Sequence, residues 1–288
     1  MSDAIALEAA HVLVVGVVRN CRDTLRSTYD RLSHALSAAN KLSFFVVESD
    51  SSDGTPEVLE QLAASHDNFN FRSLGRLSEQ IHKRTERIAL CRNAYLEELQ
   101  RNPAYQEVDY VVIADWDGVN DLVTEKGIAS CWERDDWDVC TANQAGPYYD
   151  IWALRHSLWS PNDCWEQQEF LIRMGMNPLR ARRLAVHSRM LVIPPASDWI
   201  EVQSAFGGLA IYRRSALESV RYVGVTDDGK EVCEHVSLHQ EIRAKGGKLF
   251  INPALVNTGL VDHAKYATRY GKMRYFVKEA RRLVLFSR

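Results

Sequence analysis

Two aspartates, Asp115 and Asp117, directly follow a run of apolar residues and are separated by one tryptophan. In an extended chain, residues i and i+2 share a face, so both carboxylates can point together from the end of a strand. Paired carboxylate oxygens suit Mg²⁺ or Mn²⁺, and such an ion can bridge phosphate oxygens. The spacing therefore predicts a divalent metal site, with a plain polar turn over Asp115 to Gly118 as the alternative.

A second acidic segment, Glu48 to Asp53, follows another apolar run. Its side chains are available to hydrogen-bond ribose hydroxyls or the edge of a base. Asp53 also suits the cap of the following helix, where Pro56 and Glu57 favour the first turn. Capping and ligand binding are compatible in one loop.

The elements that would position these carboxylates alternate between strands and helices. Val12 to Val18 is a β-branched run typical of a strand covered on both faces, residues 22–39 have helical spacing, and Phe44 to Val47 is apolar again. Such a β-α-β unit places both strand carboxyl ends at one edge of a parallel sheet. We expect ligand chemistry at that edge.

The rest of the chain continues the α/β pattern without internal repeats or a linker. Further helices are expected after residue 55 and over 78–100, 163–189 and 231–243, and further strands over 108–114, 205–212 and 249–252. Gly246 and Gly247 suit the end of the last helix.

Composition excludes several classes of protein. The 288 residues are 46% hydrophobic and 25% charged, which is ordinary for a folded globular chain, and the net charge of −3 favours no nucleic-acid partner. Six cysteines without metal-ligand spacing indicate free thiols in a reducing compartment. No signal peptide or membrane span is recognisable, so we expect a cytoplasmic protein.

Five segments, in this order, resemble the nucleotide-sugar-dependent glycosyltransferases of the GT-A fold. They are Val46 to Thr55, Arg92-Asn93, Asp115 to Asp117, Phe206 to Ser215, and Cys233 to His235 followed by Glu241 to Gly247. The resemblance covers about residues 12–263. It implies a single α/β domain with a mixed, mostly parallel sheet flanked by helices, a nucleotide-sugar donor such as a UDP- or GDP-sugar, and bound Mn²⁺ or Mg²⁺.

The resemblance also implies a role for each matched residue on the donor side. Glu48 would lie near the nucleoside, with Asp50 in the same loop, and Arg92 would contact the diphosphate or support the metal loop. Gly207 and Gly208 would line the donor sugar. The sequence departs from the family at Ser49 and Asp50, which stand where a second acid and a glycine are usual.

Metal and acceptor chemistry are carried over in the same way. The resemblance implies Asp115 near the ribose or the metal, Asp117 on the metal, and His263 as a further metal or diphosphate ligand. His235 replaces the aspartate that deprotonates the acceptor in inverting members, with Glu234 before it. Either residue can act as general base if its pKa is tuned; a retaining reaction, which needs no such base, is the other reading.

A narrower resemblance is to capsule-associated and related α-mannosyltransferases. It rests on Tyr148 to Arg155, Cys233 to His235 and Ile251 to Pro253. It implies mannose as the transferred hexose.

Aromatic side chains suit sugar rings, and all seven tryptophans lie in the middle of the chain. Trp116 and Trp152 are candidates for sugar contacts because they lie within motifs, and Asp150 and Arg155 are candidate acceptor contacts. Core packing is expected for most of Trp132, Trp137, Trp159 and Trp165.

The chain divides into a glycosyltransferase domain over 1–264, with a donor half at about 11–118 and an acceptor half at about 119–264, and a basic helix over 265–288. That helix is amphipathic and suits either an anionic membrane face, where a lipid-linked acceptor would lie, or docking on the core. The expected reaction is hexose transfer to a glycan or lipid-linked acceptor. The alternatives are a sugar-nucleotide nucleotidyltransferase, whose glycine-rich loop is missing after the first strand, and a glycan-binding module, which leaves the paired aspartates unexplained.

Overall fold

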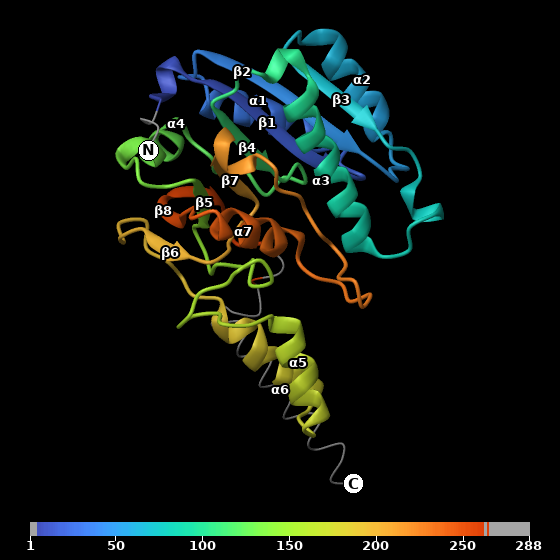
Figure 1. Cartoon of the computed structure of the whole chain (residues 1–288), viewed down its shortest axis with the longest axis vertical. Coiled ribbons are helices and arrows are strands. Elements are labelled where there is room, and N and C mark those ends of the chain that lie inside the picture. Colours follow the sequence, from blue (N-terminus) through green and yellow to red (C-terminus); the bar gives the residue numbers. More distant parts are fainter. Residues whose placement is uncertain (1–4, 262–263, 265–288) are drawn as a thin grey trace.

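The computed structural model describes residues 5–261 and 264. Within these residues, eight strands form one sheet with the order β3-β2-β1-β4-β7-β5-β8-β6 (Figure 1). The strands are β1 (His11–Val18), β2 (Lys41–Glu48), β3 (Phe69–Ser73), β4 (Tyr110–Ala114), β5 (Val139–Gln144), β6 (Ile200–Val202), β7 (Leu209–Arg213) and β8 (Leu249–Thr258).

The first half of the sheet is parallel. β1 pairs with β2 and β4, and β2 pairs with β3, all in the parallel sense. β7 runs antiparallel between β4 and β5, β8 is parallel to β5, and β6 is an antiparallel edge strand. The predicted single α/β domain with a mixed, mostly parallel sheet is confirmed.

Helices cover both faces of the sheet. They are α1 (Leu25–Ala35), α2 (Thr55–Ser65), α3 (Arg84–Arg101), α4 (Glu125–Ala129), α5 (Cys164–Arg173), α6 (Pro178–Ala185) and α7 (Glu234–Ala244). Side chains alternate along β1. Leu13 and Val15 belong to the apolar core under α3 and α7, whereas Val12 and Val14 belong to the core under α1 and α2. The uninterrupted apolar run of β1 therefore follows from its burial on both faces.

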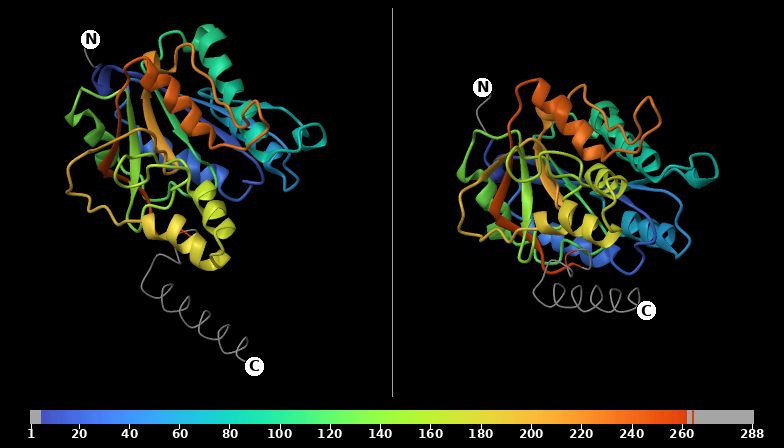
Figure 2. Two further views of the ribbon diagram at one scale, coloured as in Figure 1. Left: turned by 60° about the horizontal axis from the view of Figure 1, so that its bottom comes forward. Right: turned by 90° about the horizontal axis from the view of Figure 1, so that it is seen from below.

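Helices α5 and α6 pack against each other as a hairpin that projects from the body of the sheet (Figures 1 and 2). The sequence predicted one helical segment over 163–189. The structure divides it at Gly175, whose φ of +86° ends α5, and Pro178 begins α6. Left-handed backbone suits glycine, and proline suits a first helical turn.

Other boundaries also differ from expectation. The predicted strand over 205–212 begins only at Leu209, because Gly207 and Gly208 have positive φ angles. The helix predicted over 78–100 begins at Arg84, and the last helix begins at Glu234. β3, β5 and β6 were not expected at all.

The six cysteines are free, as predicted, and all of them are buried. Among the described residues, no helix is long and apolar enough to cross a membrane. His263 and the expected helix over 265–288 lie outside the described residues.

Candidate functional site

A pocket opens at the carboxyl ends of β1 and β4. The chain builds β2 and β3 on one side of β1 and then returns to its other side with β4, so these two ends flank the point where strand order reverses. Open α/β sheets bind ligands at such a point. The pocket has a volume of about 240 Å³ and is lined by Val17, Val18, Arg19, Cys21, Ser49, Asp50, Arg84, Arg87, Ile88, Cys91, Arg92, Asp115, Trp116 and Asp117.

Asp115 and Asp117, the two predicted metal ligands, both line this pocket. The backbone of Asp115 is fixed, because its N–H donates to the Gly208 carbonyl at 2.9 Å and its carbonyl accepts from the Asn120 side-chain amide at 2.7 Å. Asp117 is exposed, and its Oδ1 accepts only a long bond of 3.4 Å from the Val119 N–H. One carboxylate is thus held in place and the other is open to a ligand.

Arg92 is the cation at the centre of the acidic side of the pocket. It lies on α3, is only 4% exposed, and donates from Nε to Glu234 Oε1 at 3.1 Å. Its Nη2 lies 3.6 Å from Asp115 Oδ1, and its guanidinium lies over the rings of Phe206 and Tyr222. A planar guanidinium supports two carboxylates at once in this way.

Negative charge exceeds positive charge around Arg92. Burial raises the pKa of Asp115 to about 7, although the charge of Arg92 opposes the increase. The nearby carboxylates of Asp117, Asp150 and Glu234 raise the pKa of Asp115 further. A bound cation would compensate this excess charge.

The chemistry of this donor set fits a divalent cation that shares its ligands with a substrate. Among the described residues, no group of three or more His, Cys, Asp or Glu side chains is arranged to hold a metal. Asp115 and Asp117 supply two hard carboxylates, and Mg²⁺ commonly binds through one or two carboxylates plus substrate phosphates. The predicted ligand His263 lies outside the described residues.

The two acidic residues of the loop after β2, Glu48 and Asp50, have different roles. Glu48 is 2% exposed; its carboxylate accepts from the Ser51 N–H at 3.0 Å and from the Ser73 hydroxyl. It is not among the residues that line the pocket, whereas Asp50 is. Glu48 therefore holds the loop, and Asp50 is the acid that the loop presents.

Asp50 is itself held by α3 and the segment before it. Its Oδ1 accepts from the N–H and hydroxyl of Ser78 at 2.8 and 2.7 Å, and its Oδ2 lies 3.5 Å from Arg87 Nε. Burial raises the pKa of Asp50, but these hydrogen bonds and the charge of Arg87 outweigh it and lower the pKa below its ordinary value. Asp50 is thus a fixed carboxylate at neutral pH.

Gly207 and Gly208 join the acceptor side of the molecule to the aspartate loop. Both have positive φ angles, of +72° and +91°. The Gly207 N–H donates to Asp150 Oδ2 at 3.0 Å, and the Gly208 carbonyl accepts from Asp115. A Cβ on Gly208 would lie 2.8 Å from the Tyr149 hydroxyl oxygen, so the close packing requires glycine.

The predicted acceptor residues lie on one loop. Asp150 accepts from Gly207 and from the Ala153 N–H at 3.3 Å, and burial raises its pKa. The Trp152 indole donates to Asp163 Oδ2 at 2.9 Å, which orients the ring. Arg155 uses its guanidinium within the same loop, on the Trp152 and Leu154 carbonyls and on Asp163. Its interactions are those of a residue that shapes the loop.

Glu234 and His235 begin α7 beside Arg92. His235 is 3% exposed and its ring stacks on Phe206, with the centroids 3.8 Å apart. Neither ring nitrogen has a hydrogen-bond partner, and burial, aided by the charge of Arg92, holds the pKa of His235 well below its ordinary value. The imidazole is therefore neutral and a weak proton acceptor at neutral pH.

Trp116, a candidate for sugar contact, is instead a core residue. Its side chain is 1% exposed and packs edge-on against Phe44 and Phe69 in the core. β1 leaves room for it with Gly16, where a Cβ would lie 2.3 Å from the indole nitrogen. Its backbone carbonyl accepts from the Thr24 hydroxyl at 2.7 Å and so fixes the aspartate loop on α1.

Three pocket arginines, Arg19, Arg84 and Arg87, were missed by sequence reasoning. Arg84 and Arg87 are three residues apart on the helix that carries Arg92, a spacing that places these two arginines on one face. This pattern was available in the sequence. The pocket accordingly has a basic side near Asp50 and an acidic side near Asp117, with the buried Arg92 between acids.

No protein-family model matches the sequence, and no curated protein matches it. Solved structures are similar in fold. The mannosyltransferase PcManGT from Pyrobaculum calidifontis, in complex with GDP-Man and Mn²⁺, superposes with a TM-score of 0.50 at 17% identity, over 95% of this chain and 65% of that one. The likeness confirms the expected GT-A fold.

Two further similar structures have lower scores. Residues 1–349 of S. aureus TarS give a TM-score of 0.47 at 11% identity, over 87% of this chain and 60% of that one. Glucosyl-3-phosphoglycerate synthase from Mycobacterium tuberculosis, in complex with UDP, gives 0.40 at 14% identity, over 87% and 69%. The chain thus spans less than two thirds of the length of PcManGT and of TarS 1–349.

Proposed function

We propose that this chain is a metal-dependent glycosyltransferase. It would move a hexose from a nucleotide-diphosphate sugar to a glycan or lipid-linked acceptor. One observation carries the proposal: Asp115 and Asp117 line a pocket at the strand-order reversal of the sheet, next to a buried arginine. The fold shared with a mannosyltransferase in complex with GDP-Man and Mn²⁺ supports it.

Asp117 and Asp115 would hold Mn²⁺ or Mg²⁺ together with the donor's phosphates, and His263 is a proposed further ligand. When bound, the ion stabilises the negative charge that grows on the departing diphosphate. Asp117 is exposed and open to the ion, whereas Asp115 is fixed by its backbone bonds and Arg92. These two residues would therefore set where the diphosphate binds.

The arginines of the pocket would bind the phosphates and the nucleoside of the donor. Arg19 and Arg84 are exposed at the pocket and carry positive charge that suits phosphate oxygens. Arg87 lies against Asp50, so that pair would meet the nucleoside, with Ser49 beside it. The diphosphate would bind in this pocket of about 240 Å³, and the sugar would extend toward Gly207 and Gly208.

On the acceptor side, we assign the proton-accepting role to Glu234. It is a carboxylate beside Arg92, whereas the low pKa of His235 makes that imidazole a weak base. Asp150 and the oriented indole of Trp152 would contact the acceptor. Mannose is the first sugar to test, because the α-mannosyltransferase resemblance includes both this loop and Glu234.

A thermal-shift panel of UDP-, GDP-, CMP- and dTDP-sugars, with and without Mn²⁺, tests the proposal. We expect one nucleotide class to raise the melting temperature only in the presence of the cation. The control is Asp30→Asn, which removes an exposed carboxylate on α1 outside the pocket. This variant should keep the thermal shift of the wild type. If no nucleotide sugar stabilises the wild-type protein with or without Mn²⁺, the proposal is wrong.

A further inference from the structure

The α5–α6 hairpin exposes both apolar and basic side chains. We propose that the segment of this hairpin over residues 170–184 docks on an anionic lipid surface. The docking is separate from sugar transfer and can be tested without it.

Large apolar side chains are exposed on this segment. Phe170 is 51% exposed, Met174 is 68% exposed, and they lie one helical turn apart at the end of α5. Leu184 on α6 is 44% exposed. Exposed apolar residues of this size, such as Phe170 and Met174 one turn apart, mark an interaction surface.

The same segment is strongly basic. Residues 170–184 contain four arginines and neither aspartate nor glutamate, in a chain whose net charge is −3. Arg173 and Arg180 are exposed, and within the described part of the chain no carboxylate pairs with them. Arginine beside exposed phenylalanine and leucine on helices suits the interface of an anionic bilayer, where apolar groups enter the acyl boundary and cations meet the headgroups.

Charge argues against two other partners for this surface, which are a second copy of the chain and residues 265–288. The same face of a second copy would bring arginine against arginine. Residues 265–288 carry eight lysines and arginines against one glutamate, so like-charge repulsion argues against this segment as the occupant as well. Both repulsions disappear on an anionic membrane, which attracts each basic segment.

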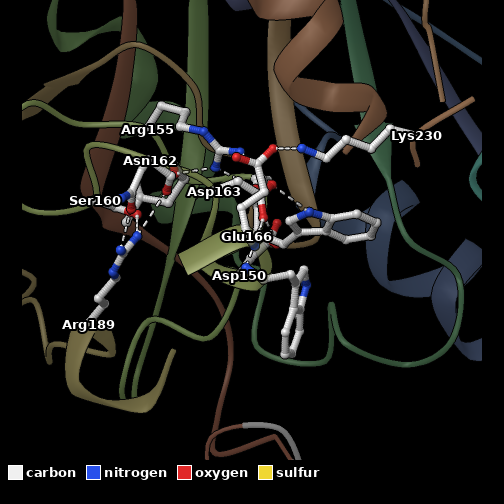
Figure 3. A network of polar contacts seen from close by, with 12 residues as sticks. Asp150, Arg155, Ser160, Asn162, Asp163, Glu166, Arg189 and Lys230 are labelled. Atoms are coloured by element: carbon white, nitrogen blue, oxygen red, sulfur yellow. Dashed lines mark hydrogen bonds and ion pairs between the residues drawn. The ribbon is translucent and has the colours of Figure 1, made fainter. Parts of the chain in front are cut away.

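The base of the hairpin is fixed to the acceptor loop (Figure 3). Asp163 Oδ1 accepts from the Trp165 and Glu166 N–H groups and caps α5, while its Oδ2 accepts from Trp152 and Arg155. The same loop carries Asp150.

Two more contacts fix the base. Arg189, which follows α6, donates to the Ser160 hydroxyl at 2.8 Å and to the Asn162 carbonyl at 3.0 Å. Glu166 on α5 pairs with Lys230, in the segment before α7 (Figure 3). A hairpin held at its base in this way would transmit the orientation of a docked surface to the acceptor side of the pocket.

Vesicle sedimentation of the full chain tests the docking. The vesicles are phosphatidylcholine alone and phosphatidylcholine mixed with phosphatidylglycerol, at low and high salt. We expect the protein to sediment with the anionic vesicles and to be released by salt. Each basic side chain at an anionic surface contributes roughly a factor of five to binding, so Arg173→Gln/Arg180→Gln should lower the partition coefficient roughly tenfold or more.

The apolar contribution is tested with Phe170→Ser/Met174→Ser, which should lower binding even at low salt. Matched controls at exposed positions elsewhere are Arg31→Gln/Arg221→Gln and Leu90→Ser, which should sediment like the wild type. Thermal melting of each variant verifies the fold, and the cation-dependent nucleotide shift reports the donor pocket separately.

Three outcomes overturn the inference. The first is a wild-type protein that does not prefer anionic vesicles. The second is full binding by both hairpin variants while Arg281→Gln/Arg282→Gln abolishes it, which assigns the membrane contact to residues 265–288. The third is a wild-type dimer in sedimentation velocity that Phe170→Ser/Met174→Ser converts to a monomer, which assigns the surface to a second copy.

Discussion

Asp115 and Asp117 are two residues apart, and the fold holds them in different ways. The backbone of Asp115 is bonded to Gly208 and Asn120, and its carboxylate faces Arg92. Asp117 lies exposed at the mouth of the pocket. The fixed residue would set the geometry of the site, and the open one would take most of the contact with the cation.

Asp117→Asn should therefore abolish most transfer while the fold stays intact. The amide keeps the shape of the side chain and removes its charge, so cation binding weakens and stabilisation of the departing diphosphate is lost. We expect kcat/KM to fall at least roughly 100-fold. Steady-state assays against Asp30→Asn measure this, and wild-type turnover in Asp117→Asn would contradict the metal assignment.

A second pair of substitutions distinguishes the roles of Glu234 and His235. Glu234→Gln removes the proposed proton acceptor, and we expect kcat to fall roughly 100-fold or more while donor-dependent thermal stabilisation persists. His235→Asn removes the stacking on Phe206 and should mainly lower stability. Assays of both variants decide the assignment: turnover that survives Glu234→Gln and disappears in His235→Asn reverses the two roles.

At the scale of elements, the turn before β7 joins the two sides of the site. Gly208 packs against Tyr149 and Val119 at distances that exclude a Cβ, and its carbonyl receives the Asp115 N–H. A change at this turn should therefore move the aspartate loop as well as lower stability.

Gly208→Ala is expected to destabilise the protein more than Gly246→Ala. Both residues have positive φ angles, of +91° and +87°, and share the cost of a strained backbone, about 1–3 kcal/mol. Only Gly208 adds a steric clash, since no atom lies within 4 Å of a Cβ on Gly246. Urea unfolding compares the two variants, and equal losses would show that the close packing at Gly208 is unimportant.

The sequence predicted the elements that have strong periodicity. β1 and β2 are apolar runs buried on both faces, and α3 carries a long helical pattern. β3 was not predicted because it is a short strand at the edge of the sheet, with mostly exposed or half-buried side chains. β5 escaped because it buries the polar pair Asn143 and Gln144, whose hydrogen bonds no local pattern reveals.

The candidate site was predicted in outline by residue type and order. Asp115, Asp117 and Arg92 do lie together, because strand ends and a helix motif fix where they must be. The burial of Trp116 and the use of Arg155 within its own loop depend on packing between distant segments, so the sequence could not show them.

At the scale of the whole molecule, two buried histidines join α7 to the core. His239 lies between the Ser204 and Tyr212 hydroxyls, 2.9 and 2.8 Å from its ring nitrogens, and burial lowers its pKa to about 3. His235 is one turn earlier, and burial lowers its pKa as well. Both rings are therefore neutral in the folded protein over the physiological range.

Stability should consequently fall as the pH decreases below 6.5. The unfolded chain binds a proton at His239 from about that pH downward, whereas the folded chain does not until about pH 3. The contribution of His239 to the free energy of unfolding is therefore fully present above pH 6.5. On acidification this contribution decreases by up to about 1.4 kcal/mol per pH unit.

Urea unfolding between pH 7 and pH 5 measures the slope in the wild type, His239→Gln and the exposed α1 control His34→Gln. We expect a shallower slope only in His239→Gln, even though that variant is less stable throughout. An unchanged slope would mean that His239 is not shielded from protons in solution.

The central claim is that acidic side chains in this pocket hold a cation that in turn holds a nucleotide sugar. Titration calorimetry of the donor selected by the thermal-shift panel, with and without Mn²⁺, tests it most directly in the wild type and in Asp117→Asn. The account predicts saturable binding that requires Mn²⁺ and is lost in Asp117→Asn. Binding of equal strength in excess EDTA, or undiminished binding by Asp117→Asn, would contradict it.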